Sequence, residues 1–127
     1  MRTTSRAKAK DGVYYEYFKD RSVAVRGHYL KGKKTGVWKY FLANGKLKAT
    51  GLCADDKMIG EWKWWRESGE LMQTGSFDEN EQKTGTWTRY HPNGAVIDRG
   101  EFVAGKAKGE WKTYDENGVL VKTRHYT

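Results

Sequence analysis

The sequence predicts an all-β protein, an elongated antiparallel β-meander of about five stacked hairpins. One pattern recurs four times at intervals of 24 or 25 residues, and a period of this length indicates stacked structural units. Within each copy, an Asn-Gly or Ser-Gly pair separates two runs of β-forming residues, which is typical of a tight hairpin turn. The tryptophans that begin the four copies are Trp38, Trp62, Trp87 and Trp111.

Composition favours a thin structure over a sphere. The chain of 127 residues is long enough for one domain, but its hydrophobic content is 37% and its mean hydropathy is −0.93. Aromatic residues nevertheless make up 14%, so the buried surface is expected to come mainly from Trp, Tyr and Phe. The single cysteine excludes an internal disulfide. No signal-peptide pattern or membrane-length apolar run is found, so a cytoplasmic location is predicted.

The chain divides into an arm and one repeat domain. Residues 1–11 are predicted to be a flexible basic arm, because the first ten residues hold four Lys or Arg and no acidic or aromatic residue. Residues 12–127 form the domain, and its first hairpin, 12–26, turns at Asp20-Arg21-Ser22. This hairpin departs from the pattern, as expected for a unit that caps a stack. The repeats themselves are expected at 27–50, 51–74, 75–99 and 100–127.

A two-residue turn at Asn44-Gly45 fixes the register of the first repeat. It places Trp38 opposite Gly51, and Leu42 opposite Leu47. In the other copies Trp62, Trp87 and Trp111 face Gly75, Gly100 and Arg124. Each ring is therefore predicted to lie over a glycine on the neighbouring strand, which leaves room for the ring. The structural repeat positions are Trp38, Gly51, Trp62, Gly75, Trp87, Gly100 and Trp111.

A second aromatic column has the opposite parity to the tryptophans. It contains Phe41, Trp65, Tyr90 and Tyr114, and the two-residue turn places it opposite Lys48, Met72, Ile97 and Val121. Two interpretations remain open at this stage. Either both faces of the sheet carry apolar side chains, or a bulge shifts the register of each hairpin.

The residues that carry chemistry do not converge. Cys53 stands in a column otherwise made of Tyr and Phe, which predicts a small buried thiol rather than a nucleophile. The three histidines, His28, His91 and His125, fall in different repeats, so their spacing indicates repetition rather than a shared metal or catalytic site. Lys31 to Gly36 contains a Gly-Lys-rich loop, but it lies between strands rather than before a helix. The chain is therefore predicted to be a non-enzyme with no cofactor.

Charge is concentrated in the first part of the chain. The formal net charge is +8, but residues 1–50 hold thirteen Lys or Arg and only three acidic residues. From residue 26 to residue 48 no acidic residue occurs at all. Basic clusters of this kind attract anionic surfaces. The candidate residues for binding such a surface are Arg26, Lys31, Lys33, Lys34, Lys39, Lys46 and Lys48.

The unit Gly-x-Tyr-x-x-Gly-Lys-Lys-x-Gly-x-Trp-x-x-Phe-x-x-Asn-Gly-x-Leu, at residues 27–47, resembles the bacterial variant of the MORN repeat. That variant is typical of the YwqK-type family described as antitoxins, and the resemblance extends over residues 27–126. Three positions depart from it, namely Ser68 before Gly69, Cys53 in the aromatic column, and Arg124 in the last glycine column, which suggests that the sheet ends there. The resemblance implies a hairpin scaffold that binds protein partners or acidic phospholipids.

Two functional hypotheses follow. The first is a non-catalytic protein–protein interaction scaffold, in which the partner is a toxin if the chain acts as an antitoxin or immunity-type inhibitor. Unpaired terminal strands also offer a route to self-association. The alternative is binding of an anionic surface, either acidic phospholipid or nucleic acid, through the basic N-terminal half. Binding that weakens steeply with salt would distinguish the second hypothesis from the first.

Overall fold

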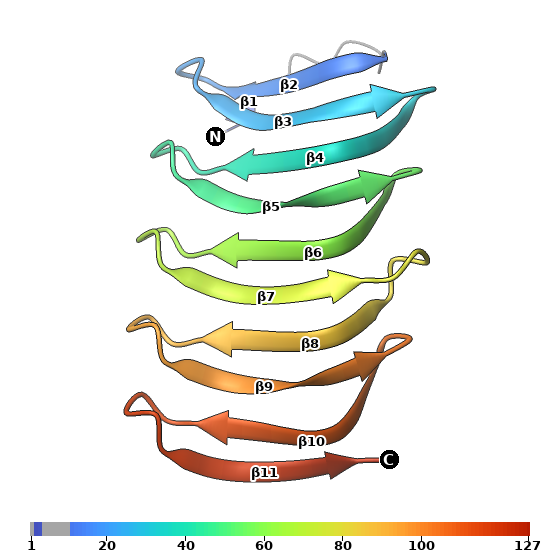
Figure 1. Ribbon diagram of the computed structural model, residues 1–127. Helices are drawn as coiled ribbons and strands as arrows, with labels where there is room; N and C mark the ends of the chain where they lie inside the picture. Colours follow the sequence, from blue (N-terminus) through green and yellow to red (C-terminus); the bar gives the residue numbers. More distant parts are fainter. Residues whose placement is uncertain (1, 4–10) are drawn as a thin grey trace.

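The computed structural model describes residues 2–3 and 11–127, and these form one antiparallel sheet of 11 strands in sequential order (Figure 1). The predicted all-β meander of hairpins is confirmed. The first strand pairs with the second at Phe18 and Tyr17, and the remainder of the predicted arm, residues 1 and 4–10, lies outside the described residues. The strands are β1 (Arg2–Thr3), β2 (Gly12–Phe18), β3 (Val23–Leu30), β4 (Lys33–Phe41), β5 (Leu47–Ala54), β6 (Lys57–Trp65), β7 (Leu71–Phe77), β8 (Lys83–Tyr90), β9 (Val96–Val103), β10 (Lys106–Tyr114) and β11 (Leu120–Tyr126).

Within the described residues, the sheet is a single elongated layer with no second layer packed on it (Figure 1). The accessible surface of the whole chain is 8314 Å². A compact monomer of this mass would expose about 6,900 Å². The excess reflects the open shape, so any core must be built from side chains that lie flat on the sheet.

The Asn-Gly turns are three-residue loops rather than the predicted two-residue turns. In the first of them, the Gly45 N–H donates to the Leu42 carbonyl at 2.9 Å, and the Leu42 N–H donates to the Lys46 carbonyl at 2.8 Å. Gly45 has a φ of 86°. This is a type I turn that closes with a glycine bulge, in which only the glycine requires the left-handed region.

A bulge in the returning strand compensates for the longer loop. Phe41 pairs with Leu47, so the predicted pair of Leu42 and Leu47 is wrong. Tyr40 pairs with Ala49, which leaves Lys48 as an extra residue and restores the predicted pair of Trp38 and Gly51. Of the two interpretations of the second aromatic column, the bulge is therefore the one that the structure contains. The other extra residues are Met72, Ile97 and Val121.

True two-residue turns lie at the other edge of the sheet. At Lys31-Gly32 both φ angles are positive, 53° and 77°, as a type I′ hairpin turn requires. Asp55-Asp56 and Ala104-Gly105 have the same combination. The link between β7 and β8 is one residue longer and closes through a bond from the Glu81 N–H to the Asp78 carbonyl. The extra residue accounts for the single 25-residue interval between tryptophans.

A glycine two residues before each tryptophan bends the strand. Gly60 has a φ of 64°, and the register moves from a pair between Gly51 and Trp62 to a pair between Leu52 and Ile59. Two residues of β6 therefore lack a partner in β5. The bends are visible where β4, β6, β8 and β10 begin (Figure 1). The equivalent glycines are Gly36, Gly85 and Gly109.

The ring of each of the four repeat tryptophans covers a glycine of the preceding strand. A Cβ atom placed on Gly51 would lie 2.2 Å from Cδ2 of Trp62. The ring that covers Gly51 is therefore Trp62, and the prediction that Trp38 covers it is wrong. The Trp62 Nε1–H donates to the Leu52 carbonyl at 2.9 Å, which satisfies the buried polar group. Trp38 and Trp62 are only 1% and 2% exposed. In the same way, Trp38 lies over Gly27, Trp87 over Gly75, and Trp111 over Gly100.

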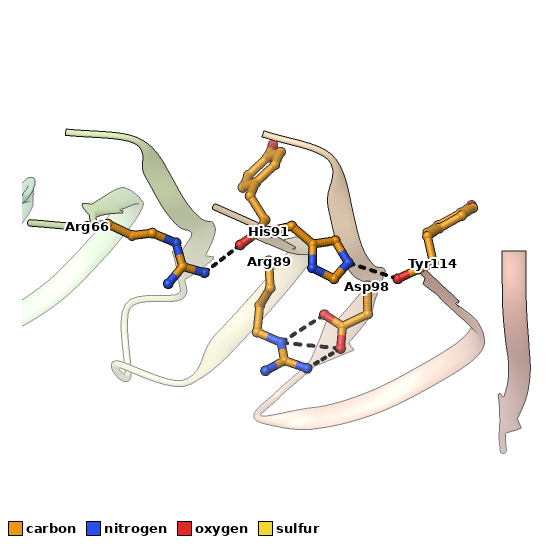
Figure 2. A network of polar contacts seen from close by, with 6 residues as sticks. Arg66, Arg89, His91, Asp98 and Tyr114 are labelled. Atoms are coloured by element: carbon orange, nitrogen blue, oxygen red, sulfur yellow. Dashed lines mark hydrogen bonds and ion pairs between the residues drawn. The ribbon is translucent and has the colours of Figure 1, made fainter. Parts of the chain in front are cut away.

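Side chains on the loops tie each repeat to the next. Figure 2 shows the Arg66 guanidinium donating to the Tyr90 carbonyl at 2.8 Å and the His91 ring nitrogen Nε2 at 3.0 Å from the Tyr114 carbonyl. The Asn44 amide similarly donates to the Glu67 carbonyl at 3.2 Å. These bonds connect positions one repeat apart, so they hold the loop edge of the stack in register.

Candidate functional site

The described part of the chain offers no assembled metal site. Within it, no group of three or more His, Cys, Asp or Glu side chains lies close enough to hold a metal ion. Cys53 is buried against the tryptophan core, and burial raises the pKa of its thiol to about 11. The thiolate form required for nucleophilic chemistry is therefore scarce at neutral pH. No helix capable of crossing a membrane occurs among the residues that the structure describes.

The predicted basic residues do not form one patch. Lys31 and Lys33 lie at the edge with the two-residue turns, and Lys48 is the bulge residue near the other edge. The Lys34 ammonium lies 4.9 Å from the centre of the Trp38 ring, on the tryptophan face. The Lys46 ammonium is held by the Ser68 carbonyl at 3.1 Å. These five positions therefore point in different directions.

The remaining two, Arg26 and Lys39, are direct cross-strand neighbours. Arg26 precedes Gly27, the glycine that Trp38 covers, and Lys39 follows Trp38 itself. Because successive side chains of a strand alternate between faces, both project from the face opposite the tryptophan rings, which we call the opposite face. The strand register extends this pair into a row across nine strands. We call it the basic row, and it contains five basic residues, four threonines and no acidic residue: Arg26, Lys39, Thr50, Lys63, Thr74, Thr88, Arg99, Lys112 and Thr123.

An exposed apolar row accompanies the basic row over the first strands. Val37 pairs with Leu52, and Leu52 pairs with Ile59, on the same opposite face. Val37 is 50% exposed and Leu52 is 44% exposed, and Val13 on β2 is 53% exposed. Single exposed apolar residues are ordinary, whereas contiguous ones rimmed by polar residues are a feature of interaction surfaces. We call Val13, Val37, Leu52 and Ile59 the apolar row.

A hollow of about 260 Å³ lies where the two rows meet. Its lining residues are Arg26, His28, Val37 and Lys39. The hollow coincides with the bend at Gly36, where the register between β3 and β4 shifts and the two strands lose their regular pairing. It combines one apolar wall with three side chains that can donate hydrogen bonds, and no carboxylate of the described residues lines it.

The same positions in later repeats present different chemistry. Where the first repeat has Val37, the next three have Glu61, Thr86 and Glu110. The Thr86 hydroxyl donates to the Glu101 carboxylate across the strands, and Glu110 lies 3.4 Å from the Lys112 ammonium. The opposite face therefore carries the apolar row and several basic side chains over β2–β6, with Glu61 also on β6. Over β8–β10 the equivalent region holds a hydrogen bond between Thr86 and Glu101 and an ion pair between Glu110 and Lys112.

Sequence reasoning identified Arg26 and Lys39 but missed the basic row and the apolar row. The signal was present in the register, because every residue that follows a tryptophan in the pattern is Lys or Thr. Combined with the predicted pairs of tryptophan and glycine, that parity places these residues on one face. Val37 and Leu52 are also a predicted cross-strand pair once Trp38 is paired with Gly51.

Comparison with known proteins gives a family and weak structural likenesses. The family model described as MORN repeat variant matches residues 34–52, 58–79, 83–104 and 107–127, more than half of the chain. No curated protein matches the chain. Similar solved structures include a mutant form of S. aureus TarM in complex with fondaparinux, alpha-GlcNAc-glycerol and UDP, at 16% identity and a TM-score of 0.47 over 85% of this chain.

Two further structures are a crystal structure of TarM and the GtfA/B complex bound to UDP and GlcNAc. The first has 16% identity and a TM-score of 0.46 over 84% of this chain, and the second has 12% identity and a TM-score of 0.35 over 93%. The present chain spans only 20% of each TarM chain and 23% of the GtfA/B chain.

Proposed function

Four successive matched repeats make this chain a member of the MORN repeat variant family, and we propose that it is a non-catalytic scaffold that binds a protein partner. Repeats of this family generally serve as modules that bind proteins or lipids. The observation that carries the proposal is the pair formed by the apolar row and the basic row on the opposite face of β2–β6. The partner is accordingly a protein with an apolar contact surface and acidic residues around it.

The chemistry of the two rows supports a protein partner. Apolar side chains at the centre of an interface contribute affinity, while surrounding charges orient the partner and raise the association rate. Val37 and Leu52 fulfil the first role, and Arg26, Lys39 and Lys63 the second. An antitoxin or immunity-type inhibitor is one form of this function, with an acidic toxin as the partner. Self-association through the terminal strands is a further form.

Capture experiments with matched variants test the proposal. The chain is immobilised and exposed to a lysate of its native cells, and proteins bound by the wild type are compared with those bound by Val37→Glu/Leu52→Ser. This variant gives the first repeat side chains found at equivalent positions later in the chain. Loss of a protein that the wild type and Thr86→Val both retain is the expected result. A bound protein that remains on both variants would contradict the proposed surface.

Binding of an anionic surface is the second candidate, and the absence of acidic residues from the basic row favours it. The probes are vesicles containing phosphatidylserine and a single-stranded oligonucleotide. On this hypothesis binding falls steeply with salt, and the salt slope decreases by about one unit for each contacting lysine or arginine removed. Arg26→Ala and Lys39→Ala are the variants of interest, and Lys106→Ala is the control. Salt-independent binding would contradict this candidate.

A further inference from the structure

One column of aromatic rings on the tryptophan face, the column that bridges successive repeat tryptophans, ends in the second half of the sheet. Tyr40 lies between Trp38 and Trp62, with its ring centre 6.3 Å from each. Trp64 lies in the same way between Trp62 and Trp87, at 6.2 Å and 5.7 Å. Both bridging rings come from the position two residues after a repeat tryptophan. After Trp87 that position is occupied by Arg89, so no ring of this column bridges Trp87 and Trp111.

A partly enclosed hollow of about 120 Å³ lies in the place of the missing ring. An enclosed apolar cavity of roughly 150 Å³ holds one benzene molecule, so this open hollow can cover part of a ring but cannot enclose one. Arg89 leaves the space free because its guanidinium turns to Asp98, with Nε 3.0 Å from Oδ1 and Nη2 2.5 Å from Oδ2 (Figure 2). The lining residues are Gln73, Lys83, Trp87, Arg89, Asp98, Phe102 and Trp111.

We propose that this hollow binds one aromatic side chain, tryptophan or tyrosine, of another polypeptide. The molecule itself shows what fits, because Tyr40 and Trp64 fill the equivalent positions in the two preceding repeats. A ring inserted between Trp87 and Trp111 would continue the tilted stacking of the ladder. The site lies on the tryptophan face, so it is separate from the protein-binding surface proposed above and can fail or hold independently of it.

The walls of the hollow favour an aromatic ring with a polar edge. Trp87, Phe102 and Trp111 supply apolar surface, with ring centres 5.9 Å and 5.1 Å apart along the series. The Lys83 ammonium lies over Trp87 and Phe102, at 4.8 Å and 5.0 Å from their centres, and limits one side. Asp98 is a partly exposed carboxylate at the rim, able to accept a bond from an indole N–H or a phenol O–H.

The chain does not supply the ring from its own N-terminal residues. Residues 1–10 contain no aromatic side chain. The last ring of the column is Trp64, which is already engaged with Trp62 and Trp87. Arg89 and, in the final repeat, Thr113 hold the later positions. The occupant is therefore expected to come from a different polypeptide.

Titration of the intact chain with small model compounds tests the site. The probe is N-acetyl-L-tryptophanamide, and N-acetyl-L-leucinamide is the control of similar polarity without a ring. The six tryptophans give six indole N–H signals in a nitrogen-correlated NMR spectrum. The expected result is a saturable shift of the Trp87 and Trp111 signals with the tryptophan probe only, while the signals of Trp38 and Trp62 remain in place.

Two variants that fill the hollow complete the test. Arg89→Trp copies Trp64 into the third repeat, and Arg89→Phe supplies a smaller ring in case the first variant does not fold. Each is expected to abolish the probe-induced shifts and to raise the midpoint of thermal unfolding. Val37→Glu/Leu52→Ser, on the other face, should bind the probe like the wild type. Equal shifts with the leucine compound, equal shifts at all six indoles, no shift at Trp87 and Trp111, or unchanged binding by a folded filled variant would overturn the proposal.

Discussion

The two halves of this sheet share a backbone but differ in what they bury and display. In the first half, Trp62 lies between the rings of Tyr40 and Trp64 and is 2% exposed. In the second half, Trp111 is partly exposed. The aromatic rings that it contacts among the described residues are those of Phe102 and Tyr126. The glycine bends and the covered glycines are nevertheless the same in both halves. The two halves therefore differ in a few side chains per repeat rather than in their backbone.

Removing equivalent tryptophans should reveal the largest difference between the halves. Trp62→Ala is expected to lower the free energy of unfolding by about 3–5 kcal/mol, as for other fully buried rings. Trp111→Ala should cost about 2 kcal/mol, because that ring is already partly in water. Chemical denaturation followed by circular dichroism measures both. Equal losses would show that the two halves are packed alike.

Valine at a covered glycine should have the next largest effect. Gly51→Val places atoms about where the Trp62 ring lies, and overpacking of this kind costs roughly 1–3 kcal/mol. Gly100→Val should cost less, because Trp111 can turn outward. The indole N–H signal of Trp62, rather than that of Trp38, should shift in the Gly51 variant. A shift confined to Trp38 would mean that the assignment of covered glycines is wrong.

The buried thiol gives the first half a pH dependence of its own. Because burial raises the pKa of Cys53 to about 11, the folded protein holds this proton more tightly than the unfolded chain does. Its contribution to stability is therefore complete below the ordinary thiol pKa and is lost as pH rises from about 9 to 11. Unfolding curves of wild type and Cys53→Ala across this range test the effect. A parallel decline in both proteins would exclude the thiol as its source.

The smallest expected effect concerns the join between the halves. Asn44 and Asn93 donate to the Glu67 and Glu116 carbonyls of the following repeat, at 3.2 Å and 2.9 Å. Ser68 occupies the equivalent place and is too short to reach. Ser68→Asn should restore this bond, to the Pro92 carbonyl, and add about 0.5–1 kcal/mol of stability. Ser68→Gln, with the amide placed one carbon further out, is the control; equal gains from both would argue against a specific bond.

Most of the fold could be predicted from the sequence, because the residues that indicate strands and turns recur in every repeat. Four tryptophans at intervals of 24 or 25 residues predicted the meander and the pairing of Trp38 with Gly51. The pairing was obtained although the turn type was wrong, because the bulge at Lys48 cancels the extra loop residue. The bend at Gly36 was not predicted, because the presence of a glycine in a strand does not show whether its φ is positive or negative. The direction of each ring was also missed, because strand pairing alone does not say which of two flanking glycines a ring covers.

The candidate site was harder to predict from the sequence, because it depends on which face of the sheet each side chain occupies and on neighbours from several repeats. Charge counting selected seven basic residues, of which Arg26 and Lys39 are direct cross-strand neighbours on the opposite face. Lys34 is held over the Trp38 ring and Lys46 against a loop carbonyl. The hollow beside Trp87 depends on a side-chain conformation that the sequence does not specify, because it exists only when Arg89 turns toward Asp98.

Photo-crosslinking at matched positions tests the central claim most directly. A benzophenone amino acid is placed at position 37 in one variant and at position 86, the equivalent position of the third repeat, in another. Both proteins are irradiated in a lysate of the native cells. If the opposite face of β2–β6 is the binding surface, position 37 yields a discrete protein adduct and position 86 does not. An adduct formed only at position 86, or equally at both positions, would contradict the account.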